Sequence, residues 1–316
     1  MSQYNVLNGL KVRYLSADPP SPENGEVWYN SSAVRVEGVA GTGAWASGGS
    51  APAGLSGGSM AGNNTDAMMW GGDTGGPPGA WPRTSYHYNG SSWTSDGTIP
   101  IAVNVTGQAG VGHTTAIMWG GNTPPGGQAA KTFEYNGSSW TAGGDLNQPR
   151  RYAYLTGAGP QTACIAMGGN PSLAKHENYN GSSWTAKTDF PSGANSIYGI
   201  GTQTATLGVS GNNGTTASWD GSSWTGIPST LNNNRQYGAA GGANSNSAYV
   251  FGGGSSSAVE LYNGTSWATQ PSMSRARDNG GGSGISSNAL IAGATYGNTS
   301  VEQFTIPFGT ATISSS

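Results

Sequence analysis

The heptapeptide YNGSSWT occupies residues 88–94 and is repeated without change at 135–141 and 179–185. Two looser copies follow, WDGSSWT at 219–225 and YNGTSWA at 262–268. The tryptophans of these five copies lie 40 to 47 residues apart. A repeat of this length is typical of the four-stranded blade of a β-propeller, so the spacing predicts a ring of blades.

Each copy of the heptapeptide lies between two short strand-like segments. TSYHY (84–88) and KTFEY (131–135) precede the first two copies, and the Ser-Ser-Trp-Thr that follows continues as a second strand. Asn-Gly between two strands predicts a tight type I′ hairpin, because both central residues of that turn need positive φ. We expect this hairpin to join the third and outer strands of each blade, and the repeated tryptophans to pack between blades rather than bind sugars.

An apolar strand that ends in glycine precedes each hairpin, and there are six such strands. They are AMMWGG (67–72), AIMWGG (116–121), CIAMGG (164–169), ATLGVSG (205–211), AYVFGGG (248–254) and ALIAGA (289–294). Apolar side chains on both faces predict inner strands that neighbouring blades cover.

The sixth apolar strand has no hairpin after it, and we expect the N-terminal part of the chain to supply the missing strand. GTGAWASGG (41–49) resembles GSSWTAGG (137–144), and its Trp45 would complete the last blade and remove the open edge of the ring. The sequence therefore predicts an all-β chain in which residues 1–42 form an arm with a β-hairpin and residues 43–316 form a six-bladed propeller.

The composition agrees with an all-β chain rich in turns. Its 316 residues include 55 Gly and 17 Pro, and 12 Lys plus Arg stand against 15 Asp plus Glu. The formal charge of −3 and the lack of a basic stripe argue against nucleic acid as a partner. No apolar run is long enough to cross a bilayer and no secretion signal is visible, so we expect a soluble chain without membrane insertion. The lone Cys164 excludes an internal disulfide and is expected to be a buried core residue.

Several further features resemble the kelch family of β-propellers. These are the double glycine after an apolar strand, the aromatic residue before the hairpin, the tryptophan after it, and an arginine near the start of a blade, as in QPRR (148–151), NNRQ (233–236) and SRARD (274–278). The resemblance covers residues 43–316 and implies a six-bladed kelch-like propeller. The fourth repeat departs from the pattern with GVSG in place of the double glycine.

The sequence shows no catalytic constellation. His87, His113 and His176 are its only histidines and fall in different parts of different repeats, without a zinc-protease or nucleophile-elbow motif. The kelch-like copper oxidases need paired His and Tyr ligands with a Cys beside one Tyr, and Cys164 lies in a strand where such a set is difficult to build. We therefore expect no enzyme activity, no cofactor and no metal.

The N-terminal segment LKVRYLSADPPSPENGEVWYNSSAVRVEG (10–38) resembles short segments of tailed-bacteriophage virion proteins, which often carry the phrase Gly-Glu-Val-Trp-Tyr-Asn. The resemblance implies a virion structural or adhesion protein, such as a tail fibre, whose arm binds other virion proteins and whose propeller meets a host surface glycan or protein. The alternatives are a lectin-like propeller outside a virion, a capsid decoration protein and a degenerate propeller enzyme. Oligomeric state stays open.

The loops between the second and third strands differ most between repeats and are the predicted recognition face. Trp81 lies outside the repeated tryptophan register, and with Arg83, Lys131 and Lys175 it could stack on a sugar ring and pair with acidic groups. The alternative is that prolines only stiffen these loops and that Trp81 covers a neighbouring blade.

Overall fold

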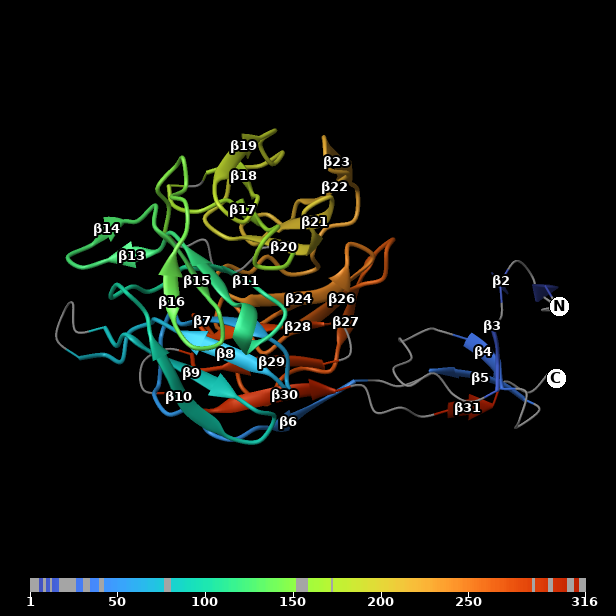
Figure 1. Ribbon diagram of the computed structural model, residues 1–316. Coiled ribbons are helices and arrows are strands. Elements are labelled where there is room, and N and C mark those ends of the chain that lie inside the picture. Colours follow the sequence, from blue (N-terminus) through green and yellow to red (C-terminus); the bar gives the residue numbers. More distant parts are fainter. Residues whose placement is uncertain are drawn as a thin grey trace. The chain divides into compact units, whose positions relative to one another are not determined.

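The computed structural model describes residues 6–7, 10–11, 13–16, 27–30, 35–39, 43–76, 81–151, 159–171, 173–285, 288–294, 298–305 and 310–312. The chain divides into two compact units. One comprises Met1–Ala44 with Thr305–Ser316, and the other comprises Trp45–Phe304. The larger unit is a six-bladed β-propeller (Figure 1), which confirms the predicted fold class.

In the first five blades, the described strands form an antiparallel sheet and run in chain order from the centre of the ring outward. The first blade contains β7 (Ser59–Gly62), β8 (Ala67–Trp70), β9 (Thr84–Tyr88) and β10 (Trp93–Thr98), and the second β11 (Gly107–Ala109), β12 (Ile117–Trp119), β15 (Thr132–Tyr135) and β16 (Trp140–Ala142). The third is described as β17 (Ile165–Met167), β18 (His176–Tyr179) and β19 (Trp184–Lys187), since residues 152–158 lie outside the described part.

The fourth and fifth blades are complete. They contain β20 (Ile197–Thr202), β21 (Ala205–Ser210), β22 (Thr216–Trp219) and β23 (Trp224–Ile227), then β24 (Ala239–Asn244), β25 (Ser247–Phe251), β26 (Val259–Tyr262) and β27 (Trp267–Gln270). The second blade also carries a separate hairpin, β13 (Asn122–Thr123) with β14 (Gly127–Gln128), and the short 3-10 helix η1 (His113–Thr115). Among the described residues, no helix is long and apolar enough to cross a membrane.

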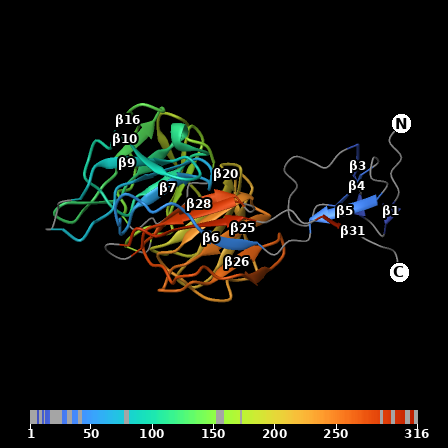
Figure 2. The same ribbon diagram turned by 90° about the horizontal axis from the view of Figure 1, so that it is seen from below.

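The sixth blade combines strands from both ends of the propeller. Its order is β28 (Gly281–Ile285), β29 (Asn288–Ala292), β30 (Val301–Thr305) and, outermost, β6 (Ala44–Ser47). The backbone N–H of Gly48 donates to the Val301 carbonyl at 2.8 Å, and Trp45 packs on Phe304 at a ring-centroid distance of 5.2 Å. Figure 2 shows β6 among the strands of the C-terminal blades, and β28 lies beside β7, which closes the ring.

In the five blades for which four strands are described, the apolar strand is the second strand of its sheet and not the innermost one. In the first blade, for example, β8 is buried along its whole length between β7 and β9. The innermost strands β24 and β28 are built mainly from small residues because they crowd around the axis: a Cβ atom at Gly241 of β24 would lie 2.3 Å from the Gly284 carbonyl oxygen of β28. Glycines at the centre therefore allow these described strands to approach one another closely.

The repeated hairpin is a four-residue loop and not the predicted two-residue type I′ turn. Tyr88 pairs with Trp93, and only Gly90 among the four loop residues has a positive φ, of 95°. The side-chain oxygen of Asn89 accepts hydrogen bonds from the backbone N–H groups of Ser91 and Ser92 at 3.0 and 2.9 Å. In this loop the asparagine acts through its side chain as a hydrogen-bond acceptor, and the glycine is the residue that adopts the left-handed backbone conformation.

Aspartate takes the same role in the fourth copy of the heptapeptide. Asp220 accepts hydrogen bonds from the backbone N–H groups of Ser222 and Ser223, both at 2.8 Å. These hydrogen bonds hold the pKa of the Asp220 carboxyl well below its usual range. The shared geometry explains why Asn and Asp are exchanged at this position of the repeat.

The repeated tryptophans pack between blades, as predicted. Trp140, Trp184 and Trp267 are buried, and Trp93 and Trp224 are half-buried. Trp140 of the second blade lies edge-on against Trp70 of the first, with ring centroids 5.3 Å apart.

The arginines near the blade starts form buried ion pairs. Three blades contain such a pair between the entering loop and the third strand: Arg150 with Glu177, Arg235 with Glu260, and Arg277 with Glu302. The free oxygen of Glu302 also accepts the backbone N–H of Ser274, and Arg277 donates to the carbonyls of Gly293 and Ser300. These arginines therefore stabilise the fold and are not free to bind a ligand.

The smaller unit holds the strands that come before and after the propeller in the chain. Its main sheet has the order β3 (Arg13–Leu15), β4 (Val27–Asn30), β5 (Arg35–Val39) and β31 (Thr310–Thr312), and β1 (Val6–Leu7) pairs separately with β2 (Leu10–Lys11). The N-terminal hairpin is β4 with β5. Because β31 pairs with β5, residues from Thr305 onward group with this unit, whereas the expected propeller boundary was residue 316. The prolines of the 10–38 segment lie outside the described residues.

Candidate functional site

The structure places Trp81 and Arg83 at the end of the loop between β8 and β9. Trp81 is half-buried and Arg83 is exposed. The Nε atom of the Arg83 guanidinium donates to the Ile99 carbonyl at 2.8 Å, which anchors this exposed side chain and leaves its two Nη groups as further donors. These two residues of the predicted face thus lie close together in the first blade.

Lys131 and Lys175 occupy the same position in the next two blades, at the start of the third strand. Lys131 pairs with Asp145 at 2.7 Å and Lys175 with Asp189 at 2.8 Å, and both pairs are exposed. Among the described contacts, no hydrogen bond or ion pair joins any two of the four predicted binding residues. The lysines therefore form a row along the rim, one per blade, and the predicted single patch with Trp81 is not assembled by direct contacts.

The β13–β14 hairpin lies on the same face as Lys131 and Lys175. In an antiparallel blade, all loops between second and third strands lie on one face of the propeller. Its Gln128 donates to the Asn170 carbonyl of the third blade at 3.2 Å. Arg151, between the second and third blades, donates to the side-chain oxygen of Asn122 and to the Gly126 carbonyl, at 3.3 and 3.1 Å. The rim loops of neighbouring blades are thus tied together and present a preformed surface.

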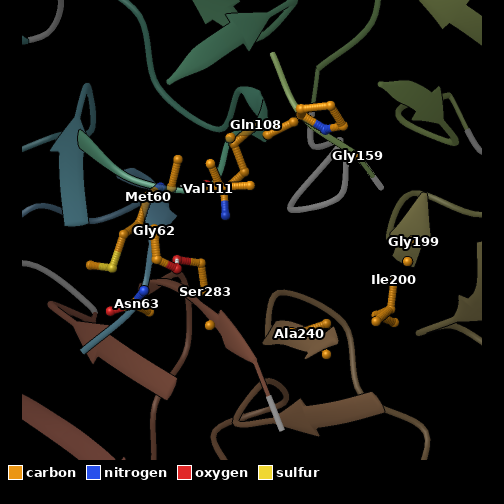
Figure 3. Close-up of a pocket in the computed structure, with 18 of the residues that line it drawn as sticks. Met60, Gly62, Asn63, Gln108, Val111, Gly159, Gly199, Ile200, Ala240 and Ser283 are labelled. Atoms are coloured by element: carbon orange, nitrogen blue, oxygen red, sulfur yellow. Dashed lines mark hydrogen bonds between the residues drawn. The ribbon is translucent and has the colours of Figure 1, made fainter. Parts of the chain in front are cut away.

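A cavity of about 290 Å³ lies at the centre of the propeller. Figure 3 shows Met60, Gln108, Ile200 and Ser283, which come from four blades, around this opening. The described lining residues are small, apolar or neutral and polar, so they offer backbone groups and amides for hydrogen bonding but no ionisable side chain.

Gln108 ties three blades together at the wall of the cavity. Its side-chain oxygen accepts the backbone N–H of Met60 in β7, and its amide nitrogen donates to the Gly282 carbonyl in β28 at 3.0 Å. A buried amide with both ends satisfied stabilises the closed ring.

A second cluster of polar side chains lies at the junction of the first and second blades, on the opposite face from the rim loops. Asp66 belongs to the β7–β8 turn, His87 to β9 and His113 to η1. One carboxylate oxygen of Asp66, Oδ1, lies 3.1 Å from His87 Nε2 and 2.5 Å from His113 Nδ1. The two imidazole rings stack with their centroids 3.7 Å apart, and all three side chains are partly exposed.

This cluster is not evident in the linear sequence because its residues are far apart in the chain and belong to two repeats. The signal for it lies in the strand register shared by the blades. His113 stands four residues before Ile117, and Gln161 and Gln203 stand four residues before Ile165 and Leu207, which have the same register position in the next two blades. Those glutamines donate to carbonyls of the preceding blade. The register thus predicts that this position reaches back to the neighbouring third strand, which in the first blade carries His87.

Comparison with known proteins adds no family to these observations. No protein-family model matches the sequence, and no curated protein shows a significant match. The kelch and phage resemblances therefore rest on the quoted motifs, whereas the six-bladed β-propeller rests on the structure.

Proposed function

We propose that this chain is an adhesion or structural protein of a bacteriophage virion, in which the smaller unit docks on other virion proteins and the propeller meets the host surface. The observation that carries this proposal is the pairing of β5 with β31, in which Val39 lies opposite Thr310. The chain enters and leaves the propeller through one small sheet. Such a connection suits a recognition domain whose two ends continue into a separate docking unit.

The rim loops of the first three blades are the proposed recognition face. Trp81 supplies an aromatic surface for a sugar ring, and the Arg83 guanidinium supplies paired donors for an acidic group. Lys131 and Lys175 are paired with Asp145 and Asp189, and they can contribute either a further N–H donor or an exchange of these partners for acids of the ligand. Exposed ion pairs of this kind contribute about 0–1 kcal/mol, so the exchange is not costly.

The phage assignment is supported by the N-terminal segment. Its Gly-Glu-Val-Trp-Tyr-Asn phrase ends in β4, which pairs with β5, so the phrase belongs to the unit that we assign to virion docking. The proposed partners are other virion proteins at this unit and a host glycan or protein at the propeller. The protein would thus be assembled into the virion and act at the cell surface.

Adsorption of the purified full chain to host cells tests the recognition face. The double variant Trp81→Ala with Arg83→Ala should lose most of the binding of the parent protein while melting at the same temperature. A matched control is Thr185→Ala with Lys187→Ala, which alters two exposed residues of the outer strand of the third blade and should bind normally. Equal binding by the parent and both double variants would show that Trp81 and Arg83 do not contribute to recognition.

A lectin-like propeller outside a virion would use the same face. It would bind glycans and respond to the Trp81 and Arg83 substitutions, but its peptides would be absent from purified particles. Adsorption therefore tests the face, and particle composition tests the virion assignment.

A further inference from the structure

The Asp66, His87 and His113 side chains bring together three groups of the types that bind transition metals. One donor atom from each residue can be chosen so that all three lie within 4.8 Å of one another. Two imidazole nitrogens and one carboxylate oxygen are a common donor set for zinc, with bond lengths of about 2.0–2.2 Å. We propose that this cluster binds a divalent transition-metal ion, with Zn²⁺ as the first candidate, and links the first blade to the second.

The donor atoms lie closer together than in an occupied zinc site. In a tetrahedral zinc site the donor atoms lie about 3.4 Å apart, as follows from zinc bond lengths. The two distances to Asp66 Oδ1, 3.1 and 2.5 Å, are both below this value. The donor atoms therefore have to move apart to admit the ion, His113 Nδ1 and Asp66 Oδ1 most of all.

The position of Asp66 is fixed by the backbone around it. In the β7–β8 turn, the Asn63 side-chain oxygen accepts the backbone N–H groups of Thr65 and Asp66 at 2.8 and 3.2 Å. The second carboxylate oxygen, Oδ2, accepts the backbone N–H of His113 at 3.3 Å. Outer contacts of this kind orient a metal ligand and leave Oδ1 facing the two imidazoles.

Gly112 allows the second blade to approach Asp66. A Cβ atom at this residue would lie 2.4 Å from Asp66 Oδ2, so a larger residue would push the carboxylate away from His113. The glycine is therefore part of the proposed site although it supplies no ligand.

Other blade junctions show that packing does not require these three side chains. Gln161 and Gln203 replace the histidine at the third and fourth blades and donate to the carbonyls of Tyr135 and Tyr179. Glu134 stands at the register position of His87, opposite Ile117, and accepts the hydroxyl of Tyr179. Blades of this fold can therefore pack against one another without a histidine at the junction.

The junction of the first and second blades uses different side-chain contacts from the later junctions. Tyr135 donates its hydroxyl to Asp96, which leaves His87 to Asp66 and His113. Two of the three histidines of the chain are therefore concentrated on one carboxylate, in a place where the next junctions use amides and a tyrosine–glutamate contact.

The donor set also narrows the class of ion. Imidazole nitrogens favour Zn²⁺, Cu²⁺, Ni²⁺ and Co²⁺ over Mg²⁺ and Ca²⁺, which prefer oxygen ligands. Three protein ligands leave one tetrahedral position for water or an external ligand, and the partial exposure of Asp66, His87 and His113 leaves room for it.

Titration of the untagged, chelator-treated full chain with ZnCl₂ at pH 7.5, followed by calorimetry, tests the proposal. We expect one ion per chain and a rise in melting temperature with Zn²⁺, because an ion that binds only the folded state stabilises it. Co²⁺ should give the visible absorption bands of a low-symmetry site with nitrogen ligands. Mg²⁺ at the same concentration should have no effect.

The variants separate this site from adventitious binding. His113→Gln copies the side chain found at Gln161 and Gln203, so it should fold and lose at least tenfold in Zn²⁺ affinity. Asp66→Asn should lose a similar factor, whereas His176→Thr removes the histidine outside the cluster and should bind as the parent does. An absence of binding by the folded parent, or equal affinity of the parent and His113→Gln, would overturn the proposal.

Discussion

The indole nitrogen of Trp140 donates a hydrogen bond to the Ser85 hydroxyl of the preceding blade, 3.1 Å away. The same contact recurs from Trp184 to the Thr132 hydroxyl at 2.8 Å and from Trp267 to Thr216 at 3.2 Å. The repeated heptapeptide thus encodes both a hairpin and a link between blades, which explains why one chain repeats it so closely.

Replacing the tryptophan of one such link should destabilise the propeller. Trp140 is 8% exposed and contacts Trp70 and Tyr135, with ring centroids 5.3 Å away in each case. Trp140→Ala should lower the free energy of unfolding by about 3–5 kcal/mol, as other large-to-small aromatic substitutions in cores do. Trp140→Phe keeps a ring and loses the hydrogen bond to Ser85, so it should cost less. A loss below about 1 kcal/mol for the alanine variant in denaturant unfolding would show that the indole is not part of the core.

One blade lacks the acceptor, and supplying it should stabilise the protein. Trp45 Nε1 is buried without a described partner, and the preceding blade has Val259 at the register position of Thr132 and Thr216. Val259→Thr should therefore raise the free energy of unfolding by about 1 kcal/mol, the usual net value of a buried hydrogen bond.

Val301→Thr is the matched control for that substitution. Val301 has the same register position in the sixth blade, but Trp93 Nε1 already donates to the Gly49 carbonyl at 3.0 Å. This variant should bring no gain in stability. If both threonine variants change the melting temperature equally, the missing acceptor at Trp45 is not the cause.

The buried ion pairs should show strong coupling between their partners. Arg277 and Glu302 are 1% and 3% exposed, so Arg277→Ala leaves a buried carboxylate and should cost about 3–5 kcal/mol. The second blade fills the corresponding positions with Val103 and Phe133, both buried. The double variant Arg277→Val with Glu302→Phe should therefore cost much less than Arg277→Ala. Additive effects of the single substitutions in a double-mutant cycle would contradict this coupling.

His176 should make stability depend on pH. Burial is the main reason why its pKa falls from 6.5 to about 4, with help from the charges of Lys187 and Arg150. Between these values the unfolded chain binds a proton that the folded chain does not bind. The contribution of His176 is thus fully present above about pH 6.5 and is lost as the pH falls toward 4, by about 3 kcal/mol at most.

Comparison with His176→Thr isolates this effect from the titration of carboxylates. Threonine is the residue at the same register position in the second blade, where Thr132 accepts the indole N–H of Trp184. The stability difference between the two proteins should shift in favour of the variant as the pH is lowered from 7 to 4. A difference that does not change with pH would show that the pKa of His176 is the same in the folded and the unfolded chain.

The ring was predictable because its signals repeat along the chain. Six apolar strands and the copy of the motif around Trp45 were enough to predict six blades, and the structure shows β6 at the outer edge of the sixth sheet. The predicted turn type was wrong because Asn-Gly alone does not determine the length of the loop. The two serines after it belong to the loop, and their backbone N–H groups donate to the Asn89 side chain. That contact depends on residues outside the dipeptide.

The sites were harder to predict because they depend on how neighbouring repeats meet. Lys131 and Lys175 look free in the sequence, but Asp145 and Asp189 pair with them 14 residues later. Asp66 and His113 are 47 residues apart, about one repeat, so only the stacking of blades brings them together. An alignment of the repeats with one another contains the signal for both the Lys–Asp pairs and the contact between Asp66 and His113.

Quantitative mass spectrometry of purified phage particles tests the proposed function most directly. Particles produced in the host that expresses this chain would be banded by density and treated with protease inhibitors before digestion. We expect peptides from both the smaller unit and the propeller in the particle band, at a constant ratio to a known structural protein of the same particle. Peptides found only in the soluble lysate, with none in the particle band, would contradict the assignment of this propeller to a virion.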